Sequence, residues 1–149
     1  MQRRKFLSLG AAAAAVSVLP VGLSATDFRA TAPKAWEAPS SREAIEALFG
    51  SSKMIEGQIQ IKAPKLAENG GAVPISVKSK MAFTTIAIFQ DANPRSAVAV
   101  VESEGGISDM TTKIKMRKSA NVTVVAKGAD GKLYSAVQKV EVSIGGCGG

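Results

Sequence analysis

Apolar and polar residues alternate along much of the chain after residue 54, and this period of two constrains the fold more than any other feature. The alternation runs from Ile55 to Lys62 and again from Val73 to Lys78, and it is typical of strands that bury one face. Met81 to Gln90 is a more continuous apolar run. Its continuous apolar sequence indicates a central strand of a sheet.

Four further strands are predicted, and residues typical of turns separate them. The strands are predicted at 97–101, 110–116, 121–127 and 133–144, and the turns at 64–71, 91–94, 105–106 and 128–132. In the last strand we expect Val140, Val142 and Ile144 to face the core. Seven short strands without crossover helices predict an all-β fold, an immunoglobulin-like β-sandwich.

One short helix is predicted before the strands. Ser40-Ser41-Arg42-Glu43 has the spacing of a capping box, apolar residues then recur at helical intervals, and Gly50 ends the run. Residues 26–39 are predicted to be a linker. Residues 40–144 are predicted to form the sandwich domain together with this helix.

The N-terminus has the features of an export signal. Arg3 and Arg4 precede a moderately apolar stretch that is rich in alanine, glycine and serine and ends at Leu23, which is typical of a twin-arginine signal peptide. A membrane anchor is the weaker alternative, because these small residues contribute little transfer free energy. We expect cleavage near Ala25, loss of residues 1–25, and a periplasmic mature protein outside the membrane.

The composition excludes several classes of site. The chain has no histidine and one cysteine, so imidazole ligation of zinc, copper or haem is excluded, as is an iron–sulfur cluster. The glycines lack the spacing of a phosphate-binding loop. Aromatic residues make up 5% of the chain, too few for a surface that stacks nucleic-acid bases. We therefore expect no cofactor, no metal site and no nucleic-acid partner.

A basic cluster stands out within a chain of formal net charge +7. It comprises Lys113, Lys115, Arg117 and Lys118. We interpret the cluster as the solvated face of a strand. Docking of acidic partners, or attraction of an anionic substrate, stays open as a second use of these charges.

The last five residues carry the best indication of function. Cys147, the only cysteine, is flanked by Gly145 and Gly146 on one side and by Gly148 and Gly149 on the other. Because glycine has no Cβ, this segment is predicted to be a thin, flexible arm that can carry the thiol into a narrow cleft of another protein. An intermolecular disulfide is the serious alternative. No base or cation near Cys147 in sequence would generate a thiolate, so we predict a covalent carrier and not an enzyme.

Several segments together resemble the SoxY family, the sulfur-carrier subunits of the Sox thiosulfate-oxidising system. They are the RRKFL start, 61–64 with 67–70 and 73–74, Asn93-Pro94, Asp130-Gly131-Lys132, and the ending Val142-Ser143-Ile144-Gly145-Gly146-Cys147-Gly148-Gly149. The terminal GGCGG is the specific element. The resemblance extends over nearly the whole chain, and it implies that Cys147 is the site of covalent sulfur attachment.

The resemblance also implies a set of partners. A c-type haem enzyme would conjugate thiosulfate oxidatively to Cys147, a manganese-dependent hydrolase would release sulfate, and a sulfane dehydrogenase would act on the remaining cysteine persulfide. A small β-sandwich subunit, SoxZ, would form a heterodimer with the chain. Assembly with this subunit in the cytoplasm would explain export in the folded state. A homodimer linked through Cys147 would be a resting form.

Two other classes of function fit the sequence less well. Ubiquitin-like sulfur carriers also end in Gly-Gly, but they need a β-grasp fold and activation in the cytoplasm. An exported immunoglobulin-like binding or scaffold module, with Cys147 in an intermolecular disulfide, would explain the strands but would give the glycines no role.

Overall fold

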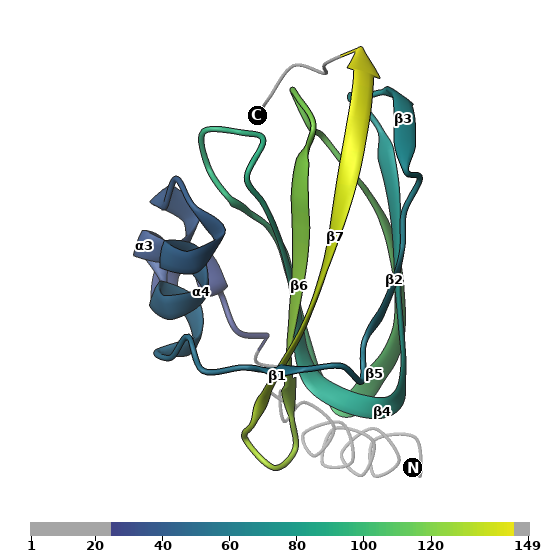
Figure 1. The fold of residues 1–149 in the computed structure, drawn as a ribbon. Coiled ribbons are helices and arrows are strands. Elements are labelled where there is room, and N and C mark those ends of the chain that lie inside the picture. The colour runs from purple at the N-terminus through teal and green to yellow at the C-terminus, as the bar shows by residue number, and fades with distance from the viewer. Residues whose placement is uncertain (1–24, 145–149) are drawn as a thin grey trace, which may run out of the picture.

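A long hairpin of two strands organises the computed structural model, which describes residues 25–144. Strands β4 (Val73–Gln90) and β5 (Ala97–Ile114) each have 18 residues and pair antiparallel from Val73 opposite Ile114 to Phe89 opposite Ala97. The hairpin bends along its length, so that its two halves lie on opposite sides of the sandwich (Figure 1).

The other strands pair directly with one half of β4 or are connected to it through intervening strands. The second half pairs with β6 (Ala120–Gly128), and β6 pairs with β7 (Leu133–Ile144). The first half pairs with β2 (Gln60–Lys62). Two short strands, β1 (Ile55–Glu56) and β3 (Leu66–Asn69), run parallel to the start and the end of β7. The predicted all-β sandwich of seven strands is therefore confirmed.

The bounds of the seven strands nevertheless differ from those predicted. The strands predicted around 73–78 and 81–90 are one continuous strand, β4, and those predicted at 97–101 and 110–116 are one strand, β5. The predicted turn at Gly105-Gly106 is therefore wrong. Gly106 has a φ of 84°, and the pairing of β4 with β5 shifts register on both sides of Phe83, opposite this point. An irregularity of this kind bends a strand without ending it.

Two segments before β4 also differ from the prediction. The strand predicted from Ile55 to Lys62 is interrupted at Gly57 and Gln58, which have positive φ angles of 105° and 64°. Its two parts, β1 and β2, consequently pair with different strands. The segment 64–71, predicted as a turn, contains β3.

The predicted linker at 26–39 forms two short helices, α2 (Phe28–Thr31) and α3 (Pro33–Glu37). The side chain of Asp27 caps the first, and Pro33 begins the second, where its missing N–H costs no hydrogen bond. Ala35 and Ala38 are buried. This contact with the domain orders a segment that the sequence alone indicated to be a connection.

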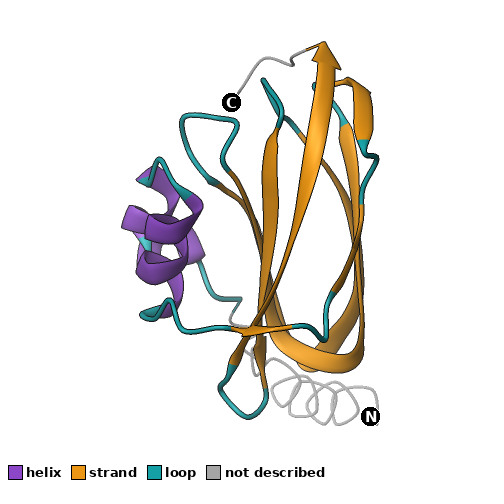
Figure 2. Cartoon of the chain, viewed as in Figure 1, coloured by secondary structure: helices purple, strands orange, loops and turns teal. Residues whose placement is uncertain are grey.

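Helix α4 (Ser41–Phe49) confirms the predicted helix. The hydroxyl of Ser40 accepts a hydrogen bond from the N–H of Glu43, and Gly50 ends the helix at a φ of 71°. The three helices lie on one outer face of the sandwich (Figure 2). Within residues 25–144, no helix combines the length and the apolar character that would be needed to span a membrane.

The core has two parts because the sheet that contains β6 is covered on both faces. Ile86 and Ile88 of β4 point into the space between the sheets, whereas Ala87 and Phe89 pack under the helices with Ile45. Residues on both faces of this part of β4 are buried. This confirms Met81 to Gln90 as part of a central strand and explains why its apolar run is continuous.

Candidate functional site

The residues to which the sequence assigns function lie outside the described residues. These are Cys147 with Gly145, Gly146, Gly148 and Gly149, and Arg3 and Arg4 of the predicted signal. What the structure describes is the support from which the chain continues toward Cys147. That support is the end of β7, which we call the arm base and define as residues 140–144.

Strand β3 holds one edge of the arm base. It pairs in parallel with β7, and the last pair joins Asn69 and Ile144. Beyond it, the N–H of Gly70 donates to the carbonyl oxygen of Ile144 at 2.8 Å. The carbonyl oxygen of Gly70 in turn accepts from the N–H of Met116 at 2.7 Å, and Met116 is completely buried. Backbone hydrogen bonds therefore connect the last described residue to the core.

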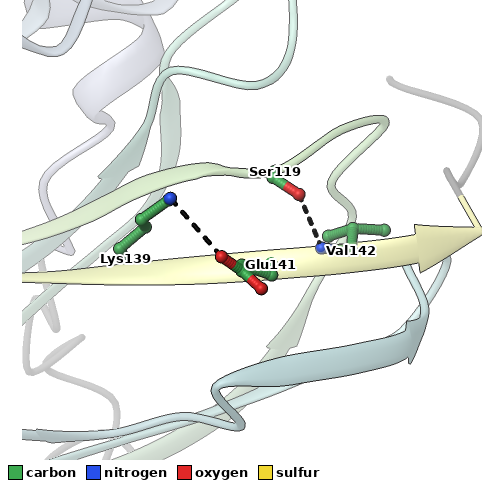
Figure 3. Close-up of polar contacts among 4 residues, drawn as sticks. All are labelled: Ser119, Lys139, Glu141 and Val142. Carbon is green, nitrogen blue, oxygen red and sulfur yellow. Dashed lines mark hydrogen bonds and ion pairs between the residues drawn. The ribbon is translucent and has the colours of Figure 1, made fainter.

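A serine holds the opposite edge. The hydroxyl oxygen of Ser119 accepts a hydrogen bond from the N–H of Val142 at 2.8 Å (Figure 3). This contact continues the pairing of β7 past Ala120, where β6 begins. Figure 3 also shows the ion pair between Lys139 and Glu141, at 3.4 Å. Both of its side chains are more than half exposed, so this pair contributes little to stability.

The side chains of the arm base are only partly as predicted. Val140 is fully buried, as expected, and Val142 is half-buried. Ile144 was expected to face the core, but its exposed fraction is 70%. The alternation of β7 therefore continues past the end of the core, because the sandwich no longer covers that face.

Sequence reasoning missed the residues that fix the arm base. Gly70 lies in a segment predicted as a turn, and Ser119 is an isolated serine between strands. The local signal at Gly70 is its neighbour Asn69, whose side chain accepts a hydrogen bond from the N–H of Gly71 at 2.8 Å and so forms an Asx turn. The pairing of both residues with β7 is a long-range contact that no local pattern encodes.

Glu141 is the ionisable side chain of the arm base, and it pairs with Lys139. Within residues 25–144, no cluster of three or more histidine, cysteine or acidic side chains could hold a metal ion. Within the described residues, the groups with shifted pKa values are Asp130, in the turn before β7, and Tyr134, near the start of β7 and so at the opposite end of that strand from the arm base. A hydrogen bond from the N–H of Lys132 lowers the pKa of Asp130. The hydrogen bond to Asp130 raises the pKa of the Tyr134 hydroxyl.

Comparison with known proteins identifies the family. A family model described as "Sulfur oxidation protein SoxY" matches residues 45–147, which include the arm base and extend through Cys147. The chain belongs to the SoxY family. No curated protein sequence matches the chain.

One solved structure agrees with this assignment, and a second shares the fold. The sulfur carrier protein SoxY from Chlorobium limicola f thiosulfatophilum is 40% identical over 68% of this chain and 94% of its own, with a TM-score of 0.60. The superoxide reductase (neelaredoxin) from Ignicoccus hospitalis is 16% identical over 58% of this chain and 80% of its own, with a TM-score of 0.51. At that identity the second likeness shows the fold alone.

Proposed function

We propose that the chain is a periplasmic sulfur carrier that holds thiosulfate-derived intermediates on Cys147 and presents them to the enzymes of the Sox system. Membership of the SoxY family and the likeness to the Chlorobium carrier support a carrier role in sulfur oxidation. The observation that carries the proposal is the family match, because it extends through the only cysteine of the chain.

The hydrogen bonds that hold the arm base in place support this role. A carrier needs a fixed point from which its reactive group can be offered to another protein, since a defined origin raises the effective concentration of the group at the receiving site. Ile144 is tied to Gly70, and Val142 to Ser119, so both edges of β7 are held just before Gly145. The four glycines around Cys147 would then let the thiol enter a narrow active site.

Two reactions on Cys147 would together convert thiosulfate into sulfate and a cysteine persulfide. In the first, the thiol loses its proton and forms a sulfur–sulfur bond with thiosulfate, and two electrons pass to the c-type haem enzyme. In the second, water cleaves the bond between the outer sulfur and the sulfonate, which releases sulfate and a proton and leaves a cysteine persulfide. The partner enzymes supply the oxidant and the hydrolytic metal, so the chain itself is a carrier and not a catalyst.

Partners and location complete the proposal. Membership of the SoxY family implies partnership with SoxZ in the Sox system, and we expect a heterodimer. Arg3 and Arg4 would direct the folded pair to the periplasm, where the conjugating enzyme, the hydrolase and a sulfane dehydrogenase would act in turn.

Replacement of the thiol tests the proposal. Cys147→Ser is expected to abolish thiosulfate oxidation by the reconstituted system, and intact mass spectrometry should find sulfur adducts on the native chain but not on the variant. Thermal unfolding should be nearly unchanged, within about 0.5 kcal/mol, because the buried core of residues 25–144 runs from Ala35 to Val140. Turnover by the variant, or an unmodified native cysteine during turnover, would contradict the carrier role.

A further inference from the structure

A basic groove lies where helices α2 and α3 meet the β4–β5 hairpin. Its volume is about 340 Å³, and its lining includes four cationic side chains, Arg29, Arg95, Lys113 and Lys115, and the ring of Trp36. No carboxylate of residues 25–144 lines it. Its two lysines belong to the basic cluster that was interpreted from the sequence as a solvated strand face, and both are exposed.

The four cations have no acidic partner in the described part of the chain. The ion pairs found between residues 25 and 144 are Lys78 with Asp109 and Lys139 with Glu141. A concave surface that gathers several positive charges without counter-charges concentrates the field and attracts anions. Within the described residues, the positive charge of the groove is therefore uncompensated.

Two buried amides hold the backbone that carries these cations. Gln90 is 1% exposed. Its side-chain nitrogen donates to the carbonyl oxygen of Arg95 at 2.9 Å, and its side-chain oxygen accepts from the N–H groups of Ala92 and Asn93. Asn93 in turn donates from its side chain to the carbonyl oxygen of Lys115 at 2.7 Å. The turn with Arg95 is thus held to Lys115, which directly follows the end of β5.

Arg29 is positioned in a different way. Its guanidinium lies over the ring of Trp36, with 4.3 Å between the guanidinium carbon and the ring centroid. The indole N–H of Trp36 donates to the carbonyl oxygen of Phe28 at 3.1 Å, which fixes the ring. An arginine stacked on an aromatic ring keeps its N–H donors free for another ligand. The helices therefore hold one wall of the groove in place.

The groove lies at the same end of the sandwich as the arm base. Lys115 directly precedes Met116, and hydrogen bonds connect Met116 to Gly70 and Gly70 to Ile144. The backbone beside Lys115 is therefore connected to the arm base through two hydrogen bonds.

We infer that this groove binds a divalent tetrahedral oxyanion, such as sulfate or thiosulfate, without forming a covalent bond. Arginine and lysine are the side chains that recognise such anions, and the planar guanidinium matches two oxygens at once. The volume of this open groove suits a small ligand with its bridging waters. This site needs no chemistry at Cys147 and so goes beyond the proposed carrier function.

Trp36 provides a direct measurement, because it is the only tryptophan in the chain and it lines the groove. Sulfate and thiosulfate should each cause a saturable change in its fluorescence in the full chain, with ionic strength held constant by sodium chloride. The same binding is expected in the Cys147→Ser chain. Loss of binding there would contradict this inference, whereas unchanged binding with lost turnover would support both proposals separately.

A matched pair of double variants distinguishes a site from a general charge effect. Arg95→Gln with Lys113→Gln should raise the Kd by at least about tenfold, since the loss of a single charged contact already costs about that factor. The control is Lys127→Gln with Lys132→Gln, which removes the same charge from a separate pocket lined by Phe49 and Leu133. Binding in the control should be unchanged.

Three results would overturn the inference. They are an absence of saturable binding, an equal loss in the control pair, or binding of a hexaglutamate peptide where neither inorganic anion binds. The last result would assign the groove to the acidic surface of a partner protein.

Discussion

At the scale of single residues, Asp130 closes the turn between β6 and β7. Its carboxylate accepts the N–H of Lys132 at 3.0 Å and the hydroxyl of Tyr134 at 3.1 Å. Both contacts favour the charged carboxylate, and the contact with Lys132 is the larger cause of its lowered pKa. Tyr134 is largely buried and packs beside Phe83, so the turn is coupled to the core.

The lowered pKa of Asp130 predicts an acid-dependent part of the stability. A carboxylate whose folded pKa is depressed stabilises the fold above its unfolded pKa, near 4, and this stabilisation is lost as the pH falls through the folded value. Asp130→Asn, which keeps the shape of the side chain but cannot titrate, should be the less stable protein at pH 7. Its disadvantage should shrink between pH 5 and pH 2, a window that spans about one unit above and two below the ordinary pKa. Urea unfolding at several pH values measures this, and a constant difference across that range would contradict it.

At the scale of elements, Gly106 allows β5 to pass through its irregularity without ending. Its φ of 84° is unfavourable for other residues, and a Cβ there would lie 2.8 Å from the Cβ of Ala82. Gly105, next to it, has neither restriction, since its nearest contact would be the Ser103 hydroxyl oxygen at 3.8 Å. The two adjacent glycines therefore differ in how well their positions would accept a side chain.

This difference can be measured with one substitution at each glycine. Gly106→Ala should lower the free energy of unfolding by about 1–3 kcal/mol, because it combines backbone strain with a close contact. Gly105→Ala is the matched control and should change it by no more than about 0.5 kcal/mol. Equal effects of the two variants in chemical denaturation would show that the irregularity does not depend on Gly106.

The glycines next to Cys147 are expected to act on access and not on thiol reactivity. Gly145→Val with Gly146→Val adds β-branched side chains that obstruct entry into a narrow site. The variant should react with a small aromatic disulfide at the rate of the native chain and with the partner enzymes more slowly. Equal slowing with both kinds of reagent would mean that these glycines influence the thiol itself.

At the scale of the whole molecule, the open edge of β5 is the main reason to expect a permanent partner. β5 pairs with β4 along one edge, and no other strand of residues 25–144 pairs with its second edge. The apolar run of β4 needs no such partner, because Phe83 and residues 85–89 are already buried within the chain. A long unpaired strand edge invites association with another chain.

We therefore expect the chain to self-associate when it is produced alone. Co-expression with a SoxZ-type subunit should give a stable one-to-one complex, because the subunit would cover a surface that otherwise pairs with copies of the chain. Sedimentation at micromolar concentration in reducing buffer distinguishes the two states and excludes dimers linked through Cys147. A well-behaved monomer under these conditions would contradict the expectation.

The features that the sequence determined by itself are those encoded within a few neighbouring residues. The alternation of apolar and polar residues predicted the sandwich, and Ser40 and Gly50 marked the ends of α4 correctly. The resemblance that included the ending around Cys147 indicated the SoxY family, which the family match confirms. Each signal is local, because hydrogen bonds at helix ends and the two faces of a strand depend on residues close in sequence.

The tertiary structure alone decided which of these local elements join. It merged four predicted strands into β4 and β5, ordered residues 28–37 as helices, and paired Gly70 and Ser119 with the end of β7. It also placed Arg29 and Trp36 beside Lys113 and Lys115 in one groove. Strand pairing and burial involve residues far apart in the chain, and their free energy depends on the whole set of contacts, so no local pattern could specify them.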